Sequence, residues 1–100
     1  MVKHIILWKL NDELSESEKE TVKRNAKTEL EALVGKVPGL LKMEIQTERL
    51  ASSNADLMLY SELEDEKSLE IYKDHPEHVR VADNFVLPYA VQRLCLDFKA

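Results

Sequence analysis

The sequence has few of the features that mark secreted, metal-binding or membrane proteins. Its 100 residues include one cysteine, Cys95, so no disulfide can form within the chain and no cysteine pair has the spacing of a metal site. No apolar run reaches the roughly 18 residues that a membrane-spanning helix needs. The N-terminus passes into a strand-like segment without the apolar core of a signal peptide, so we expect a cytoplasmic protein without a membrane partner.

Basic residues are in the minority. There are 14 Lys and Arg against 19 Asp and Glu, which gives a formal net charge of −5. A surface that binds a phosphate backbone needs clustered basic residues. Here they lie among acidic ones, as in Glu18-Lys19-Glu20. We therefore expect a solvated surface of mixed charge and no nucleic-acid partner.

Low-complexity linkers and internal repeats are also missing, and residues 1–100 are expected to form one domain. Alternation of apolar and polar residues predicts strands at 2–10, 40–47, 56–63 and 89–98. The second of these alternates cleanly between its two faces, which predicts a strand near a sheet edge with one wet face. The other three carry apolar residues on both faces.

A long helix is expected to begin near residues 15–18, because Ser15 with Glu18 and Ser17 with Glu20 both form capping-box patterns. Gly35 is expected to end it. The residues expected to form its buried stripe are Val22, Ala26, Leu30, Leu33 and Val34.

Two short helices are expected further along the chain. Asp65 is a suitable N-cap for a helix through about residue 73 that buries Leu69, Tyr72 and Ile71, and Pro76 suits the first turn of a helix through about residue 84. The order β-α-β-β-α-β predicts an α+β, ferredoxin-like fold. Such a fold has a four-stranded antiparallel sheet with its helices on one face.

The second face of this sheet needs a cover, because three strands carry apolar residues on it and 100 residues supply no further layer. A second copy of the same sheet is the simplest cover. We therefore expect a homodimer with two sheets packed face to face.

Four segments of the chain carry a resemblance to a known family: Val2–Leu10, Val37–Leu40, Leu57–Ser61 and Tyr72–Val79. In this order they resemble the stress-responsive α/β-barrel domain (Dabb) family, and the Tyr-x-x-His-Pro-x-His pattern is the most specific piece. The resemblance implies a dimeric α/β barrel with helices outside, and some relatives assemble further into larger rings. It implies less about activity, since many members have no defined reaction and a few, including a plant polyketide cyclase, are enzymes.

The resemblance to that cyclase implies that Tyr72 and His78 carry chemistry and that His4 lines the cavity. Physical reasoning adds that His78, in the first turn of a helix begun by Pro76, lies at the positive end of the helix dipole and tends to be neutral. A neutral imidazole can act as a general base, and the Tyr72 hydroxyl could polarise a carbonyl oxygen. The alternative is that Tyr72 is a core aromatic and both histidines are satisfied by hydrogen bonds.

A ligand cavity is expected where the first strand meets the helices, with His4, Ile6, Trp8 and His75 as its candidate lining. Core packing is the stronger interpretation for Trp8, and His75 can instead serve to end one helix and begin the next. His75 and His78 have no cysteine nearby in sequence, and the adjacent Glu77 is expected to point outward, so they give only a weak zinc signal. We therefore expect no metal site and no cofactor.

Two functions remain open from the sequence. The first is a small stress-associated homodimer without a defined reaction, whose cavity binds a small apolar molecule. The alternative is a cofactor-free enzyme, cyclase-like or a related lyase or isomerase, in which His78 takes a proton and Tyr72 polarises a carbonyl.

Overall fold

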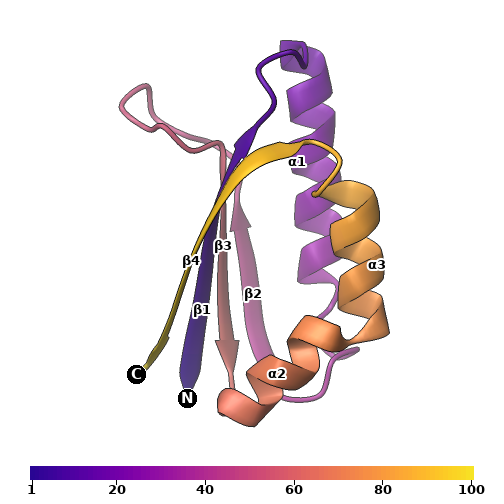
Figure 1. Ribbon diagram of the computed structural model, residues 1–100, viewed down its shortest axis with the longest axis vertical. Helices are drawn as coiled ribbons and strands as arrows, with labels where there is room; N and C mark the ends of the chain where they lie inside the picture. The colour runs from indigo at the N-terminus through magenta and orange to yellow at the C-terminus, as the bar shows by residue number, and fades with distance from the viewer.

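The computed structural model describes residues 1–100 and shows four strands and three helices. In chain order these are β1 (Val2–Leu10), α1 (Glu16–Glu31), β2 (Leu40–Gln46), β3 (Leu57–Leu63), α2 (Glu66–Asp74), α3 (Pro76–Phe85) and β4 (Ala90–Lys99). The sheet is antiparallel throughout, in the order β2-β3-β1-β4. This is the predicted ferredoxin-like fold, and Figure 1 shows its helices together on one side of the sheet.

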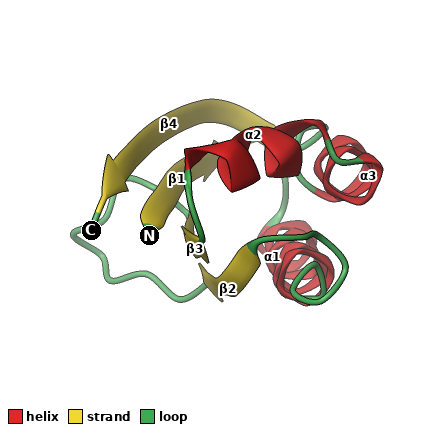
Figure 2. Ribbon diagram, turned by 90° about the horizontal axis from the view of Figure 1, so that it is seen from below, coloured by secondary structure: helices red, strands yellow, loops and turns green.

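Strand alternation builds the core between sheet and helices. In β1 every second residue from Val2 to Leu10 is buried, and β3 follows the same pattern from Leu57 to Leu63. These strands and the inner faces of the helices contribute to a cluster of 19 buried apolar residues. Figure 2 shows α1 and α3 side by side, with α2 placed against the end of the sheet near β1. None of the helices has the length and apolar character to cross a bilayer.

Local signals set the helix ends. Ser15 and Glu18 form the complete capping box at the start of α1. The helix ends at Glu31, earlier than predicted, and Leu33 begins a turn in which its carbonyl accepts from the backbone N–H groups of residues 36 and 37. The turn keeps Leu33 buried but exposes Val34, so the prediction that Val34 belongs to the buried stripe was wrong.

The strands at the sheet edges depart from simple alternation. β2 is an edge strand with exposed polar residues on one face, as predicted. A register shift between Leu40 and Lys42 buries Leu40 and exposes Leu41, whereas strict alternation would place Leu41 on the same face as the buried Met43. Ile71 of α2 was also expected to be buried and is exposed.

The sheet face opposite the helices is apolar over β4 and β1. We call this surface the open face; its apolar residues are Ile5 and Leu7 of β1, Met58 and Tyr60 of β3, and Leu94, Leu96 and Phe98 of β4. Leu94 and Leu96 are 61% and 62% exposed, and Phe98 is 41% exposed. Apolar groups on both sides of the sheet are therefore present in the structure, as the sequence indicated.

Candidate functional site

Three of the predicted site residues meet at one end of the molecule. Tyr72 lies in the last turns of α2, His78 in the first turn of α3, and His4 on the helix-facing side of β1. The ring centroids of Tyr72 and His78 are 4.1 Å apart, and those of Tyr72 and His4 are 5.8 Å apart. The break between α2 and α3 at His75-Pro76 brings the first two together. We call these three residues the His–Tyr cluster.

His78 is held in one tautomer. Its Nδ1 lies 3.1 Å from the backbone oxygen of Lys73, and because that oxygen can only accept, Nδ1 carries the proton. The lone pair therefore belongs to Nε2. Burial lowers the pKa of His78 below its usual 6.5, against the raising effect of the Lys73 carbonyl. His78 is therefore neutral at pH 7 and carries a basic nitrogen.

Tyr72 is completely buried, and its hydroxyl has no hydrogen-bond partner. Burial raises the pKa of the Tyr72 hydroxyl far above its ordinary value, so the group keeps its proton. A buried hydroxyl without a partner costs about 1–3 kcal/mol of stability. Tyr72 is thus a hydrogen-bond donor without an acceptor inside the folded chain.

His4 forms a hydrogen bond to a carboxylate that sequence reasoning missed. Its Nδ1 lies 2.5 Å from Oδ1 of Asp97, directly opposite on β4, and the other Asp97 oxygen is 3.7 Å from Nζ of Lys73. Burial lowers the pKa of His4, which outweighs the raising effect of Asp97. Burial would raise the pKa of Asp97, but the hydrogen bond from His4 and the charge of Lys73 lower it. The pair is therefore a neutral imidazole donating to an ionised carboxylate.

The other candidates take structural positions. His75 caps α3, with its Nδ1 accepting from the backbone N–H of Glu77 at 3.1 Å. Ile6 and Trp8 are buried members of the apolar core. Trp8 also lines a hollow beside the loop between β2 and β3. His75 therefore serves as a helix cap, and Ile6 is enclosed in the core.

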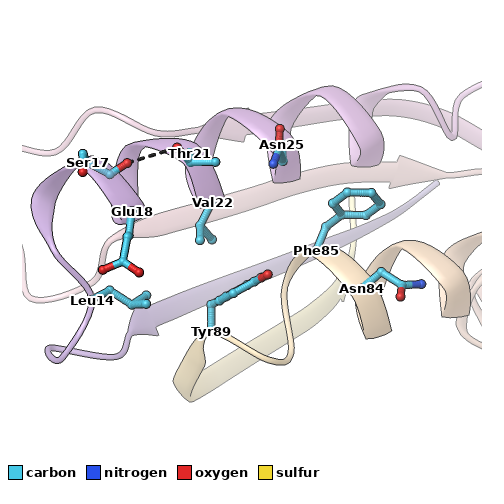
Figure 3. Close-up of a pocket in the computed structure, with 9 residues that line it drawn as sticks. All are labelled: Leu14, Ser17, Glu18, Thr21, Val22, Asn25, Asn84, Phe85 and Tyr89. Carbon is cyan, nitrogen blue, oxygen red and sulfur yellow. Dashed lines mark hydrogen bonds between the residues drawn. The ribbon is translucent and has the colours of Figure 1, made fainter.

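The surface has four hollows, and the His–Tyr cluster lines none of them. One hollow, about 370 Å³ in volume, lies between α1 and the end of α3. We call it the helix hollow. Figure 3 shows its lining residues: Leu14, Ser17, Glu18, Thr21, Val22, Asn25, Asn84, Phe85 and Tyr89.

The helix hollow is separate from the His–Tyr cluster. Phe85 of the hollow and His78 of the cluster are seven residues apart on α3, which corresponds to about 10 Å along a helix axis. Core side chains such as Val81, which is fully buried, occupy the helix face between them. A molecule in the hollow would therefore reach the cluster only if the core opened.

Comparison with solved structures gives the same fold with full coverage. A dimeric protein of unknown function from Bacteroides fragilis is 31% identical, with a TM-score of 0.93 over 99% of this chain and 95% of that one. A dimeric ferredoxin-like protein of unknown function from Thermobifida fusca is 26% identical, with a TM-score of 0.80 over 99% and 90%. A hydroxynitrile lyase from Passiflora edulis shares the fold at 14% identity, with a TM-score of 0.72 over 97% and 90%.

No curated protein matches the chain significantly. The model of the stress responsive A/B barrel domain matches residues 2–100, which is nearly every residue of the sequence. The match includes the His–Tyr cluster and both edges of the sheet. The chain therefore belongs to the stress responsive A/B barrel domain family.

Proposed function

We propose that the protein is a homodimer that binds a small, mainly apolar molecule in the helix hollow of each subunit. The observation that carries this proposal is the chemistry of the hollow. Leu14, Val22, Phe85 and Tyr89 supply apolar surface from α1, α3 and the segments beside them. A volume of about 370 Å³ falls within the range of about 300–1,000 Å³ that is typical of small-molecule sites.

The rim of the hollow narrows the class of ligand. The polar lining residues are Ser17, Thr21, Asn25 and Asn84, and Glu18 is the one charged residue. Thr21 and Asn84 already donate to backbone oxygens of their own helices, so they offer a ligand mainly acceptor oxygens. Glu18 is occupied by the capping box of α1. The hollow therefore suits a neutral molecule with an apolar body and one or two hydrogen-bonding groups.

The dimer is supported by the open face and by the relatives. Leu94, Leu96 and Phe98 leave a continuous apolar stripe on one strand exposed to solvent in a single chain. The proteins from Bacteroides fragilis and Thermobifida fusca are both described as dimeric. Packing of two open faces would bury the stripe and leave the helix hollow, on the opposite side of the sheet, accessible. We further propose that the dimer works in the cytoplasm, since its lone cysteine gives it no disulfide to maintain.

Ligand binding is tested by filling the hollow. Asn25→Trp places a large side chain at the rim from an exposed position of α1, so the core is left intact. Arg24→Trp adds the same side chain at the neighbouring exposed position, which does not line the hollow. Small apolar molecules that raise the Tm of the wild type and of Arg24→Trp should not raise that of Asn25→Trp. Equal shifts in all three proteins would place the binding site elsewhere.

A second function, cofactor-free catalysis on an activated carbonyl compound, is favoured by the fixed tautomer of His78. Nε2 of His78 is a neutral base beside the Tyr72 ring, and Tyr72 holds an unused donor. A substrate would need the core to open, because no hollow reaches these groups. Such a base would catalyse exchange of the acidic C–H of a 1,3-diketone with deuterated solvent. Exchange that is lost in His78→Ala and kept in His75→Ala supports this function, and equal exchange in all three proteins contradicts it.

A further inference from the structure

The pairing of β1 with β4 gathers three side chains that commonly bind metals. His4 stands opposite Asp97, and Cys95 lies two residues before Asp97 on the same side of β4. The donor atoms of these three residues all lie within 4.8 Å of one another. The sequence pointed only to His75 and His78 as a possible metal pair. It missed this set because the residues are 91 and 93 positions apart in the chain.

We infer that His4, Cys95 and Asp97 form a site for a zinc-like divalent cation. Sγ of Cys95 lies 3.8 Å from Nδ1 of His4 and 3.5 Å from Oδ1 of Asp97. Zinc bonds of about 2.3 Å to sulfur and about 2.0 Å to nitrogen or oxygen, at tetrahedral angles, place such donors about 3.5 Å apart. Two of the three separations therefore already suit a shared ion.

The separation between His4 and Asp97 must increase when the cation binds. Nδ1 of His4 and Oδ1 of Asp97 are 2.5 Å apart because they share a proton, whereas a common tetrahedral ion would hold them about 3.3 Å apart. A rotation of the Asp97 side chain, which is partly exposed, supplies this movement. The cation then binds Nδ1 of His4, and the single imidazole proton is carried on Nε2 instead, so the ring stays neutral. The Cys95 thiol loses its proton to solvent.

The charges match a divalent cation. A thiolate and a carboxylate together carry two negative charges, and the imidazole is neutral. Lys73 lies 3.7 Å from the other oxygen of Asp97, where it can orient the carboxylate as an outer partner. Its positive charge opposes the cation, but it also lowers the pKa of the Cys95 thiol, against burial and the Asp97 charge, which together raise that pKa. The pairing of thiolate with imidazole favours zinc over magnesium or calcium.

The site is open to solvent on one side. Cys95 and Asp97 are exposed, while His4 is buried. Three protein ligands leave the fourth tetrahedral position for water or an added ligand. All three donors lie on the helix-facing side of the sheet, so pairing of two open faces would not cover them.

Cobalt(II) tests the site directly, since a thiolate bound to cobalt absorbs in the near ultraviolet and tetrahedral cobalt absorbs in the visible. The untagged, full-length protein should bind one Co²⁺ per chain with a thiolate charge-transfer band, and Zn²⁺ should displace it. Cys95→Ser should abolish the band, and Asp97→Asn should weaken Zn²⁺ binding by about tenfold or more. His78→Asn removes a histidine outside the site and should bind both metals as the wild type does.

The outcomes separate the site from surface binding of metal. A wild type without the thiolate band, or Cys95→Ser with unchanged Zn²⁺ affinity, overturns the inference. Loss of binding in His78→Asn equal to that in Asp97→Asn would also overturn it. Circular dichroism and Tm measured without metal show whether each variant is folded, and His4→Gln provides an independent ligand variant if Asp97→Asn is not.

Discussion

At the scale of single residues, the Tyr72 hydroxyl is one of two buried side-chain polar groups without a hydrogen-bond partner, the other being Nε1 of Trp8. The hydroxyl has no hydrogen-bond partner, whereas the aromatic ring that carries it packs against both histidines of the cluster. Tyr72→Phe keeps the ring and removes the unpaired group. We expect the free energy of unfolding in urea to rise by about 1 kcal/mol.

The opposite result would be informative as well. A loss of stability by about 1 kcal/mol or more in Tyr72→Phe would mean that the hydroxyl has a partner in solution, because only a bonded group stabilises the fold. Tyr72→Leu serves as the control, since it also removes the ring and should destabilise the protein by core disruption.

The two histidines of the cluster make stability depend on pH. Burial lowers the pKa of both His4 and His78 below 6.5 in the folded state. Below pH 6.5 the unfolded chain therefore binds more protons than the folded chain, and the free energy of unfolding falls as the pH falls. The loss begins near pH 6.5 and levels off once the pH passes below the two lowered pKa values.

Urea unfolding at several pH values between about 7 and 5 measures this slope. His78→Asn lacks one of the two proton equilibria and should show a flatter slope than the wild type. Asn84→Ala, on the same helix, changes no titrating group and should keep the wild-type slope. A wild type whose stability is constant over this range would contradict the lowered pKa values.

The sequence supplied part of the site and missed the rest for a physical reason. The pairing of Tyr72 with His78 was implied by the resemblance to the cyclase, and the two residues lie near each other in the chain, on either side of the helix break at Pro76. The bond from His4 to Asp97 depends on the register of β1 with β4, which local patterns do not define. The one available signal was a carboxylate at position 97, between the apolar residues Leu96 and Phe98.

At the scale of elements, the turn before β2 depends on Gly39. Its φ is +80°, and a Cβ there would lie 2.3 Å from Oγ and 2.6 Å from Cβ of Ser68, in the first turn of α2. The Ser68 hydroxyl can rotate away, but its Cβ can move only with the helix. Gly35 has a φ of +91°, and a Cβ there would meet nothing within 4 Å.

The two glycines are therefore matched controls for each other. Gly35→Ala should cost about 1–2 kcal/mol from backbone strain alone. Gly39→Ala has the same strain and a clash with Ser68, so we expect it to cost about 1–3 kcal/mol more. Equal losses in urea unfolding would show that α2 shifts freely to make room.

The ends of helices were predicted well where a side chain caps the helix, and poorly where only the backbone conformation sets the end. Ser15, Asp65 and Pro76 marked the starts of the three helices correctly. The end of α1 was placed too late, because Gly35 lies in the turn after the helix and does not cap it directly. The register shift in β2 is not visible in the local alternation, which would place Leu41 rather than Leu40 on the buried side of the strand.

At the scale of the whole molecule, the structure limits how two copies can associate. Along the outer edge of β2, the N–H of Ile45 donates to Glu31, and its carbonyl accepts from Lys27. These α1 side chains occupy the backbone groups that another strand would need. The edge at Ile45 is therefore unsuited to strand addition, and the apolar open face is left as the main surface for a second copy.

A charge in the middle of the open face tests this arrangement. Leu96 is 62% exposed in the single chain and lies at the centre of the apolar stripe on β4, so Leu96→Glu would bury a carboxylate between two packed sheets. Leu50→Glu places the same charge in a loop, at a residue that is 78% exposed. Light scattering at micromolar concentration should give twice the chain mass of 11.6 kDa for the wild type and Leu50→Glu, and the single mass for Leu96→Glu.

The Tm of the wild type should also depend on the equilibrium between monomer and dimer. A dimer that buries the open face unfolds at a Tm that rises with protein concentration, because dissociation is coupled to unfolding. The Tm of Leu96→Glu should be lower and independent of concentration. The contrary result is a wild type with the mass of a single chain and a Tm that does not change with concentration. It would mean that Leu94, Leu96 and Phe98 stay exposed in solution, and it would contradict the homodimer.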